Sequence, residues 1–560
     1  MSVITETVEL SVTAASSTLR PTHGKPFPDI ASLSRLSLTR EDNEMSASIA
    51  LSSRSVESAS SSNGRSLLRT TITIAQPSFI NFLTSFTNGL ITVSLPSIAT
   101  SILLPRALYL WPSSVYGLTA GALLLIAGSM CDILGPRRIE LLGILLLGAF
   151  TVACGFSATG VQLVVFRALQ GVATAMHLPA SVAIVAGAVR KGRARNVGFA
   201  CLGLSQPLGF SVGLVVSGVM VERVGWRMGF WLAGAAMLVA GGVAYWSIPD
   251  VGRNEVAEGE SVWKKLGKEI DWVGGVVVSG GLALLAYVLA ILSASLSTIH
   301  TPTTASLLAL SLILLIAFPF WMHHRTTHGL PALIPNSLWR NIPFASTCVM
   351  VALSYGVINS MELFSSLYFQ EVQSYSALTT SLYLLPNLLT GVALNLTMGL
   401  FVDRWSARVL VVGSSFICAL APLFMAVVDP TWKYWYLEFW AQVFAPWSGD
   451  CLFTVGLIIV SESFREEEQG MAGAVFNTVA QFGMSLGMGV CQVVALGIMR
   501  NNERVGHGGG HGEAFENVSV GDTLRGYRAG FWTMFAMMIV CGGIAVVGLK
   551  RAGKVGVKTD

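Results

Sequence analysis

Charged residues are scarce in this chain of 560 residues, because Asp, Glu, Lys and Arg together make up only 12% of it, against ~25% in soluble domains. So few charges cannot cover the surface of a soluble protein of this length, which excludes an ordinary soluble enzyme. The eight cysteines lie singly and form no C-x-x-C pair, so we expect neither a disulfide framework nor a metal site. The net charge of +4 is too small to indicate a nucleic-acid partner.

Apolar residues dominate the sequence, with 53% hydrophobic residues and 57 glycines. A helix needs about 20 apolar residues to cross the hydrocarbon core of a membrane, and fourteen such runs follow one another between residues 72 and 549. The sequence therefore predicts an all-α integral membrane protein with fourteen transmembrane helices. Residues 1–69 differ, since they hold 17 serines, seven basic and seven acidic residues. We expect a disordered tail there, either simply solvated or regulated by phosphorylation.

Basic residues predict the orientation, because Lys and Arg concentrate on the cytosolic side of membrane proteins. With the tail in the cytosol, 26 of the 35 Lys and Arg residues face the cytosol, 8 face outward and Arg167 lies within a span. The even number of spans then places both termini in the cytosol. We expect a monomeric, multi-pass protein of the plasma membrane or the vacuolar membrane. Asn517, in an N-x-S sequon of the last outer loop, is the expected glycosylation site.

A compact motif ends the second apolar run, where Gly128, Asp132 and Gly135 are followed by Arg137 and Arg138. Anchoring by positive charge explains the two arginines, but it explains neither the carboxylate nor the glycines. Glycine allows a close helix contact, and a carboxylate at this place can meet a helix N-terminus or an arginine. We therefore expect the motif to act as a gate.

A weaker copy of this motif follows the tenth run and comprises Gly399, Asp403 and Arg404. Two copies roughly 270 residues apart suggest that the chain consists of two related halves. We expect the second copy to lie at the corresponding gate of the second half.

The fourth run contains Arg167, Gln170 and Gly171. An arginine in a membrane helix costs about 2.5–3.5 kcal/mol on insertion scales unless it faces a partner or a wet cavity. Gln170 lies one turn further along roughly the same face. We favour a functional role in gating or proton coupling, with snorkelling to the outer interface as the alternative.

These motifs, together with the Gly/Pro-rich fifth run, resemble the signature motifs of the major facilitator superfamily. Further segments resemble its fungal 14-spanner drug:proton antiporters of the aminotriazole-resistance type, namely 110–119, 225–230, 271–274, 368–373 and 526–532. The resemblance implies the major facilitator fold, with six-helix bundles at 70–249 and 343–550, two additional helices within 250–342 and a cytosolic tail at 551–560. Asn88 and Gln206 depart from the motifs of these drug exporters.

The resemblance also implies roles for individual residues. It makes the Asp132 motif a cytoplasmic gate latch and Arg167 the arginine linked to proton movement. In the fifth run it implies an antiporter-type kink at Pro207, Gly209 and Gly213.

Three further acidic residues lie within or beside apolar runs: Glu362, Glu371 and Asp450. A carboxyl group protected from water can stay protonated, which suits it to carry protons. We expect Glu362 and Asp450 to take part in proton coupling. The alternatives are a pore-lining residue without a coupling role for Glu362, a structural hydrogen bond at a helix break for Asp450 and an interfacial position for Glu371.

A secondary active transporter, not an enzyme, accounts for these features. We expect it to export a small, largely apolar organic compound, such as a drug, toxin or secondary metabolite, in exchange for protons. No phosphate-binding loop is present, so the proton gradient is the expected energy source and no cofactor is expected. The alternatives are a facilitator or uptake carrier for a small solute such as ammonium or borate, and a transporter-derived sensor.

Overall fold

The computed structural model describes residues 70–189, 193–248, 262–294, 296–401, 405–506 and 519–550. They all belong to one compact unit, Arg69–Asp560. Fourteen helices of this described part are long and apolar enough to cross a membrane, and their most apolar windows have mean hydropathies of 1.2 to 2.3. The predicted all-α class and the predicted number of membrane helices are confirmed.

The first membrane helix is Thr70–Ser101. The other helices are α3 (Trp111–Leu134), α4 (Pro136–Gly155), α5 (Gly160–Ala188), α6 (Arg193–Arg223), α7 (Trp226–Ser247), α8 (Val262–Glu269), α9 (Trp272–Ala294), α10 (Pro302–Thr327), α11 (Ile342–Leu367), α12 (Ala377–Phe401), α13 (Ala407–Val427), α14 (Glu438–Phe444), α15 (Trp447–Ser463), α16 (Glu466–Gly506) and α17 (Val520–Gly548). Short helical turns are η1 (Arg106–Leu108), η2 (Leu296–His300), η3 (Leu338–Arg340) and the π-helical η4 (Tyr368–Val372).

Polar residues and prolines mark where several of these helices begin. The Thr159 side chain accepts a hydrogen bond from the backbone N–H of Gln162 at the start of α5, and Asn341 does the same for Phe344 in α11. Such caps satisfy N–H groups that have no partner within the helix. Helices α3, α4, α10 and α11 carry a proline in their first two positions, where no N–H is needed.

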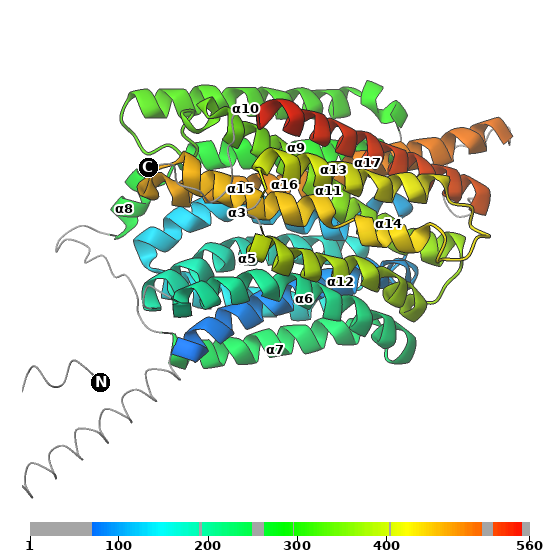
Figure 1. Cartoon of the computed structure of the whole chain (residues 1–560), viewed down its shortest axis with the longest axis horizontal. Coiled ribbons are helices and arrows are strands. Elements are labelled where there is room, and N and C mark those ends of the chain that lie inside the picture. Colours follow the sequence, from blue (N-terminus) through cyan, green and yellow to red (C-terminus); the bar gives the residue numbers. More distant parts are fainter. Residues whose placement is uncertain are drawn as a thin grey trace, which may run out of the picture. The chain divides into compact units, whose positions relative to one another are not determined.

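The membrane helices form two sets that pack side by side (Figure 1). The N-terminal set comprises Thr70–Ser101 and α3 to α7, in which α3 and α4 both pack on α5, and α7 packs on α4. The C-terminal set comprises α11 to α17, in which α11 packs on α16 and α13 packs on α17. The two sets meet where α3 contacts α16 and where α6 contacts α12.

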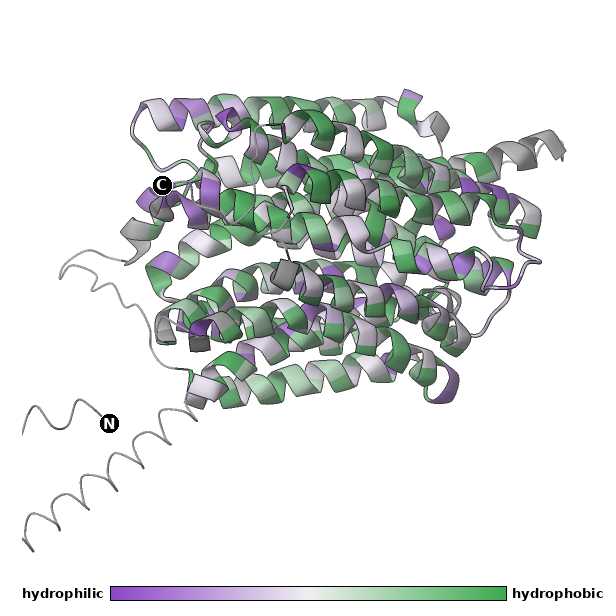
Figure 2. Ribbon diagram, viewed as in Figure 1, coloured by the Kyte–Doolittle hydropathy of each residue, from purple (hydrophilic) through white to green (hydrophobic). Residues whose placement is uncertain are grey.

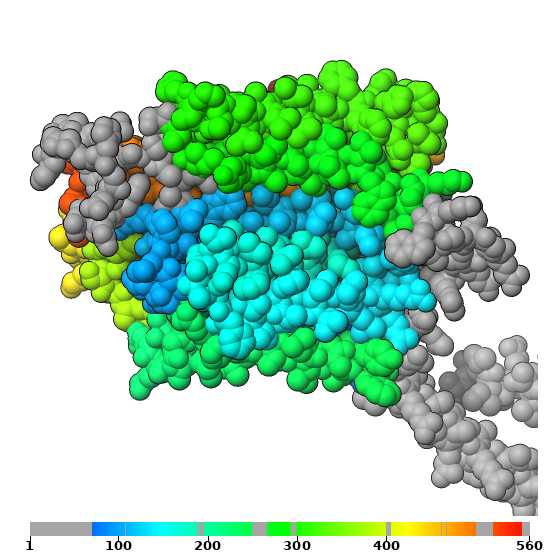
Figure 3. Space-filling view, turned by 180° about the vertical axis from the view of Figure 1, so that it is seen from behind, coloured from blue at the N-terminus to red at the C-terminus, as the bar shows by residue number. Residues whose placement is uncertain are grey.

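Two further helices, α9 and α10, lie along one edge of the body beside the N-terminal helices (Figure 3). Helix α9 contacts both α3 and α16, so it touches both sets, and α10 packs on α9. Only 11% of the most apolar window of α10 is buried. Its apolar side chains therefore face the surroundings, as expected for a helix in contact with lipid.

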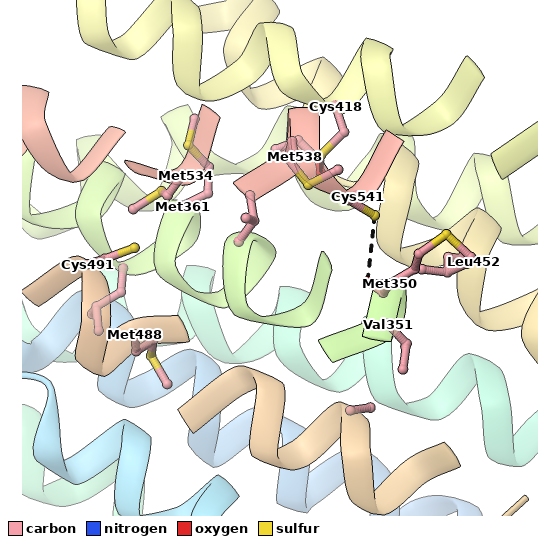
Figure 4. Packing of buried hydrophobic residues seen from close by; sticks show 14 of the residues in the cluster. Met350, Val351, Met361, Cys418, Leu452, Met488, Cys491, Met534, Met538 and Cys541 are labelled. Carbon is pink, nitrogen blue, oxygen red and sulfur yellow. Dashed lines mark hydrogen bonds between the residues drawn. The ribbon is translucent and has the colours of Figure 1, made fainter. Parts of the chain in front are cut away.

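Hydrophobic residues cover the middle of the helices, while hydrophilic residues gather toward their ends and in the connections (Figure 2). Inside the C-terminal set, methionines and cysteines from different helices pack together (Figure 4). Cys541 of α17 and Met350 of α11 lie in contact there, with the thiol of Cys541 3.7 Å from the backbone carbonyl of Met350. Flexible thioether side chains fill irregular gaps between such helices.

Candidate functional site

A cavity of about 660 Å³ lies between the two helix sets. The N-terminal set lines it with residues of Thr70–Ser101, α3, α5 and α6, and the C-terminal set with residues of α11, α12, α15 and α16. Seven lining side chains are carboxamides: Asn81, Asn88, Gln206, Asn359, Asn387, Asn395 and Gln481. The rest of the lining is mostly apolar, so these amides stand in a largely apolar wall.

Glu362 and Asp450 are the only acidic or basic side chains among the described residues that line this cavity. Both are partly exposed, although each belongs to a membrane helix. The structure therefore brings together two of the residues expected to couple protons.

A helix break positions Asp450. The twelfth membrane span is divided into α14 and α15 around Pro446, and Asp450 lies in the first turn of α15. A carboxylate is favoured there by the positive end of the helix dipole. Gly391 of α12 lies opposite, and a Cβ at this glycine would come 2.9 Å from Oδ2 of Asp450. Any side chain at Gly391 would require the carboxylate to shift.

Arg167 lies behind the cavity wall and is only 1% exposed. Its Nε donates to the carbonyl of Pro112 at 2.8 Å, and its Nη2 donates to Oδ1 of Asn88 at 2.6 Å. The guanidinium carbon also lies 4.6 Å from the ring centre of Tyr116. The alternative of snorkelling to the interface is wrong, because tertiary packing surrounds this arginine with acceptors.

Gln170 extends this network, as the helical spacing predicts. Its Oε1 accepts from Nη1 of Arg167 at 2.9 Å, and its Nε2 donates to the hydroxyl of Thr151 in α4. The neighbouring Gly171 lies against α3, where a Cβ would collide with Thr119 and the carbonyl of Tyr116. The Arg167 motif therefore ties α5 to α3, α4 and the first membrane helix.

The motif around Asp132 lies at the end of the bundle where α3 passes into α4, called here the Asp132 end. Gly135 has φ +89°, a conformation that favours glycine, and α4 starts at the next residue, Pro136. Arg137 donates to the carbonyl of Tyr245 at 2.8 Å, at the end of α7, while Arg138 is exposed.

Asp132 itself is exposed, and no hydrogen bond or ion pair joins it to another described residue. Gly128 lies in ordinary contact with Pro179 of α5, since a Cβ there would lie 4.0 Å from the proline. Among the described side chains, Asp132 therefore forms no hydrogen bond or ion pair of the kind expected for a latch. Gly399 lies within α12, whereas Asp403, Arg404 and the sequon at Asn517 lie outside the described residues.

Helix α6 runs without interruption through Pro207, so the expected kink does not break the helix. Gly209 and Gly213 allow close packing, because a Cβ at either position would collide with the carbonyl of Phe82 or Phe86. Pro207 lines the cavity. The glycines thus bring the backbones of α6 and Thr70–Ser101 together at the cavity wall.

The opposite end of the bundle, called the Glu371 end, joins the two sets by polar contacts. Nη2 of Arg106 lies 2.9 Å from Oε2 of Glu371, and the same oxygen accepts from the hydroxyl of Tyr527 at 2.8 Å. Arg106 belongs to the N-terminal half, whereas Glu371 and Tyr527 belong to the C-terminal set. Sequence reasoning found Glu371 but not its partners, which lie far away along the chain.

Further hydrogen bonds join the sets toward the same end. Ser366 donates to the carbonyl of Thr92 at 2.8 Å, and Gln370 donates to that of Val93 at 3.1 Å. Glu222 at the end of α6 accepts from the N–H of Leu378 at 3.1 Å, in the first turn of α12. Toward the Asp132 end, by contrast, the cavity extends along α6, α12 and α15 to Ala200, Leu396 and Leu457.

Sequence reasoning missed a buried pair of ionisable residues near the Asp132 end. The ring Nδ1 of His177 in α5 lies 3.0 Å from Oε2 of Glu140 in α4, and both side chains are 0% exposed. Nε2 of this histidine has no partner in the described structure. The signal that could have found the pair was an ionisable residue inside each of two apolar runs.

A body with fourteen described membrane helices and a cavity between two helix sets has the architecture of a membrane transport protein. The model of the Major Facilitator Superfamily matches residues 78–488. The chain therefore belongs to this superfamily, as the sequence motifs indicated, and it is a transporter and not an enzyme.

Relatives of this chain occur in fungi. It is 37% identical over 530 residues to MFS-type transporter 1 of Pyricularia oryzae, a match that covers 88% of this chain and 86% of the relative. It is 25% identical to the low affinity ammonium transporter of Saccharomyces cerevisiae, covering 75% and 77%. It is 24% identical to the efflux pump terJ of Aspergillus terreus, covering 75% and 76%.

A solved structure supports the fold. A peptide transporter, POT, in complex with sulfate superposes with a TM-score of 0.60 at 16% sequence identity, covering 84% of this chain and 94% of that one. At this level of identity the likeness concerns the fold alone.

Proposed function

We propose that this transporter exports a drug-sized organic compound in exchange for protons and that the cavity is its transport site. The observation that carries the proposal is the cavity itself, about 660 Å³ in volume, lined by both helix sets and by Glu362 and Asp450. Its volume lies within the ~300–1,000 Å³ of pockets that hold drug-sized ligands. The efflux pump among the relatives supports the same class of transport.

The conformation supports a mechanism in which access alternates between the two membrane faces. Polar contacts join the sets at the Glu371 end, while the cavity extends toward the Asp132 end. With the Asp132 end in the cytosol, as the basic residues predict, this conformation receives substrate from the cytosol. Rocking of the sets then closes the Asp132 end and opens the Glu371 end.

The two carboxyl groups of the cavity bind and release the exchanged proton. In the outward-open state, Glu362 or Asp450 takes up a proton from outside as substrate leaves. In the inward-open state, the same group releases the proton to the cytosol as substrate enters. Each conformational change then carries either substrate or proton, which couples the two fluxes.

Arg167 acts as a positioning residue in this mechanism, since it does not itself line the cavity. Its hydrogen bond orients the Asn88 side chain, and its guanidinium packs on the ring of Tyr116. Both of those residues line the cavity. The planar guanidinium holds acceptors in different directions at once, which an ammonium group cannot do in the same geometry.

Carriage of a small solute such as ammonium is the second candidate, and the name of the yeast relative favours it. A cavity of about 660 Å³ is far larger than one ammonium ion requires. The two candidates differ in their energetics as well, because a facilitator moves its solute down the solute gradient alone.

Efflux from sealed vesicles that contain the purified protein tests the proposal. Organic substrate flux should rise with an imposed pH gradient, should collapse when a protonophore dissipates it and should need no ATP. Vesicles with the Glu362→Gln, Asp450→Asn double variant serve as the control with the same lipid and protein content. If organic substrate flux does not depend on the pH gradient and ammonium flux is saturable, the export proposal is rejected and the protein is a facilitator for a small solute.

A further inference from the structure

We propose that the cavity selects organic cations and excludes organic anions of the same shape. This inference rests on the proposed function, because it treats the cavity as the substrate site. It adds a substrate class that the expectation of a largely apolar compound did not contain.

The charges on the cavity wall support this selectivity. Glu362 and Asp450 both face the cavity, and no lysine, arginine or histidine is found among its described lining residues. Two carboxylates that share one site repel each other, and a bound cation relieves the repulsion. An anion in the same place would add a third negative charge.

Arg167 does not offset these carboxylates at the cavity surface. Its Nε, Nη1 and Nη2 donate to Pro112, Gln170 and Asn88, and the Tyr116 ring packs on the guanidinium. The positive charge is thus engaged by uncharged oxygens and by an aromatic face behind the wall. An anionic substrate would find no free cationic group there.

Aromatic rings beside the carboxylates suit a bulky organic cation. Tyr355 and Phe453, whose ring centres lie 5.9 Å apart, come from α11 and α15, the helices that carry Glu362 and Asp450. Phe210 lines the cavity from α6 in the other set. The negative face of an aromatic ring attracts a cation, most strongly where water is excluded.

The seven carboxamides complete the site. A carboxamide carries both donors and an acceptor but no charge, so these side chains can hydrogen-bond polar groups without a charge preference of their own. The carboxylates therefore determine the preferred charge, while the amides and rings accommodate different skeletons. The ligand class that fits is an amphiphilic organic cation.

Two probes of the same shape and opposite charge test the inference: tetraphenylphosphonium and tetraphenylborate. Each is measured for saturable binding to the purified full-length protein in lipid nanodiscs, with empty nanodiscs correcting for partition into lipid. Tetraphenylphosphonium should bind at least tenfold more tightly than tetraphenylborate. Equal affinity for the two, or tighter binding of the anion, would overturn the inference without any variant.

Variants then assign the preference to the carboxylates. The double variant Glu362→Gln, Asp450→Asn should lose at least tenfold in tetraphenylphosphonium affinity. It should then bind the cationic and the anionic probe with similar affinity. Asp429→Asn removes an exposed carboxylate outside the cavity and should bind as the unmodified protein does. A monodisperse double variant that still binds the cation with full affinity would contradict the assignment.

Failure of this inference and failure of the proposed function give different results. Cation-selective binding without flux driven by a pH gradient would reject export and keep the substrate class of the cavity. Proton-driven export of a neutral or anionic compound, without cation binding, would keep export and reject the substrate class.

Discussion

The contact between Arg106 and Glu371 should hold the Glu371 end of the transporter closed. Glu371→Gln keeps the volume of the side chain but removes the charge that accepts from both Arg106 and Tyr527. Buried hydrogen bonds to charged groups contribute about 1.5–3 kcal/mol, and exposed ion pairs contribute about 0–1 kcal/mol. The Arg106 and Glu371 side chains are 22% and 14% exposed, which places this contact between those limits.

We therefore expect Glu371→Gln to weaken the closed state by about 1.5 kcal/mol, which corresponds to roughly a tenfold rise in the population open at this end. Tyr527→Phe removes one of the two hydrogen bonds and leaves the ion pair. It should raise the open population by a smaller factor, about two- to fivefold, as for a loss of about 0.5–1 kcal/mol.

Labelling of a single cysteine measures this population. Ser85→Cys places a thiol in the cavity wall. Of the eight native cysteines, seven are buried, and the partly exposed Cys201 is replaced by serine. A membrane-impermeant thiosulfonate reagent is added on the Glu371 side, and its reaction rate reports how often the cavity opens to that side.

Asp429→Asn is the matched control, because it removes an exposed carboxylate at the same end whose hydrogen bonds go to Thr431 within the C-terminal set. It should leave the labelling rate unchanged. If Glu371→Gln also labels at the unmodified rate, the ion pair does not restrain the gate and the reasoning from the interface is refuted.

Four further results are expected. Gly209→Ala should lower the free energy of unfolding by about 1–3 kcal/mol, since its Cβ would collide with the Phe82 carbonyl. Gly203→Ala should be tolerated, because a Cβ there would have no atom within 4 Å. Equal thermal stability of the two variants would contradict the close packing. Arg167→Lys should reduce flux strongly at normal membrane abundance, because lysine cannot hold Pro112, Gln170 and Asn88 together; full flux would reject the positioning role. Glu362→Gln should make flux less dependent on the pH gradient while substrate still binds, since an amide does not titrate, and an unchanged pH dependence would assign coupling elsewhere. Tags at both termini should be inaccessible on intact cells, and a tag that binds antibody from outside would reverse the orientation.

The sequence alone determined the class of the protein. Membrane spans are a local property of hydropathy over about 20 residues, so the number of spans could be predicted without knowledge of packing. Helical spacing likewise placed Arg167 and Gln170 on one face, where they hydrogen-bond. The motifs pointed to the superfamily that the matched residues 78–488 show.

Only the tertiary structure decided which side chains share a site. Glu362 and Asp450 come from helices nearly 90 residues apart in the sequence, and Arg106 meets Glu371 across 265 residues. The average hydropathy of a span says little about the rotation of the helix about its own axis. That rotation decides whether a side chain faces lipid, a neighbouring helix or the cavity. For this reason only the packing could show that Arg167 is buried and that Gly209 lies against the backbone of the first membrane helix. The same rotation decides that seven carboxamides scattered along the sequence line a single cavity.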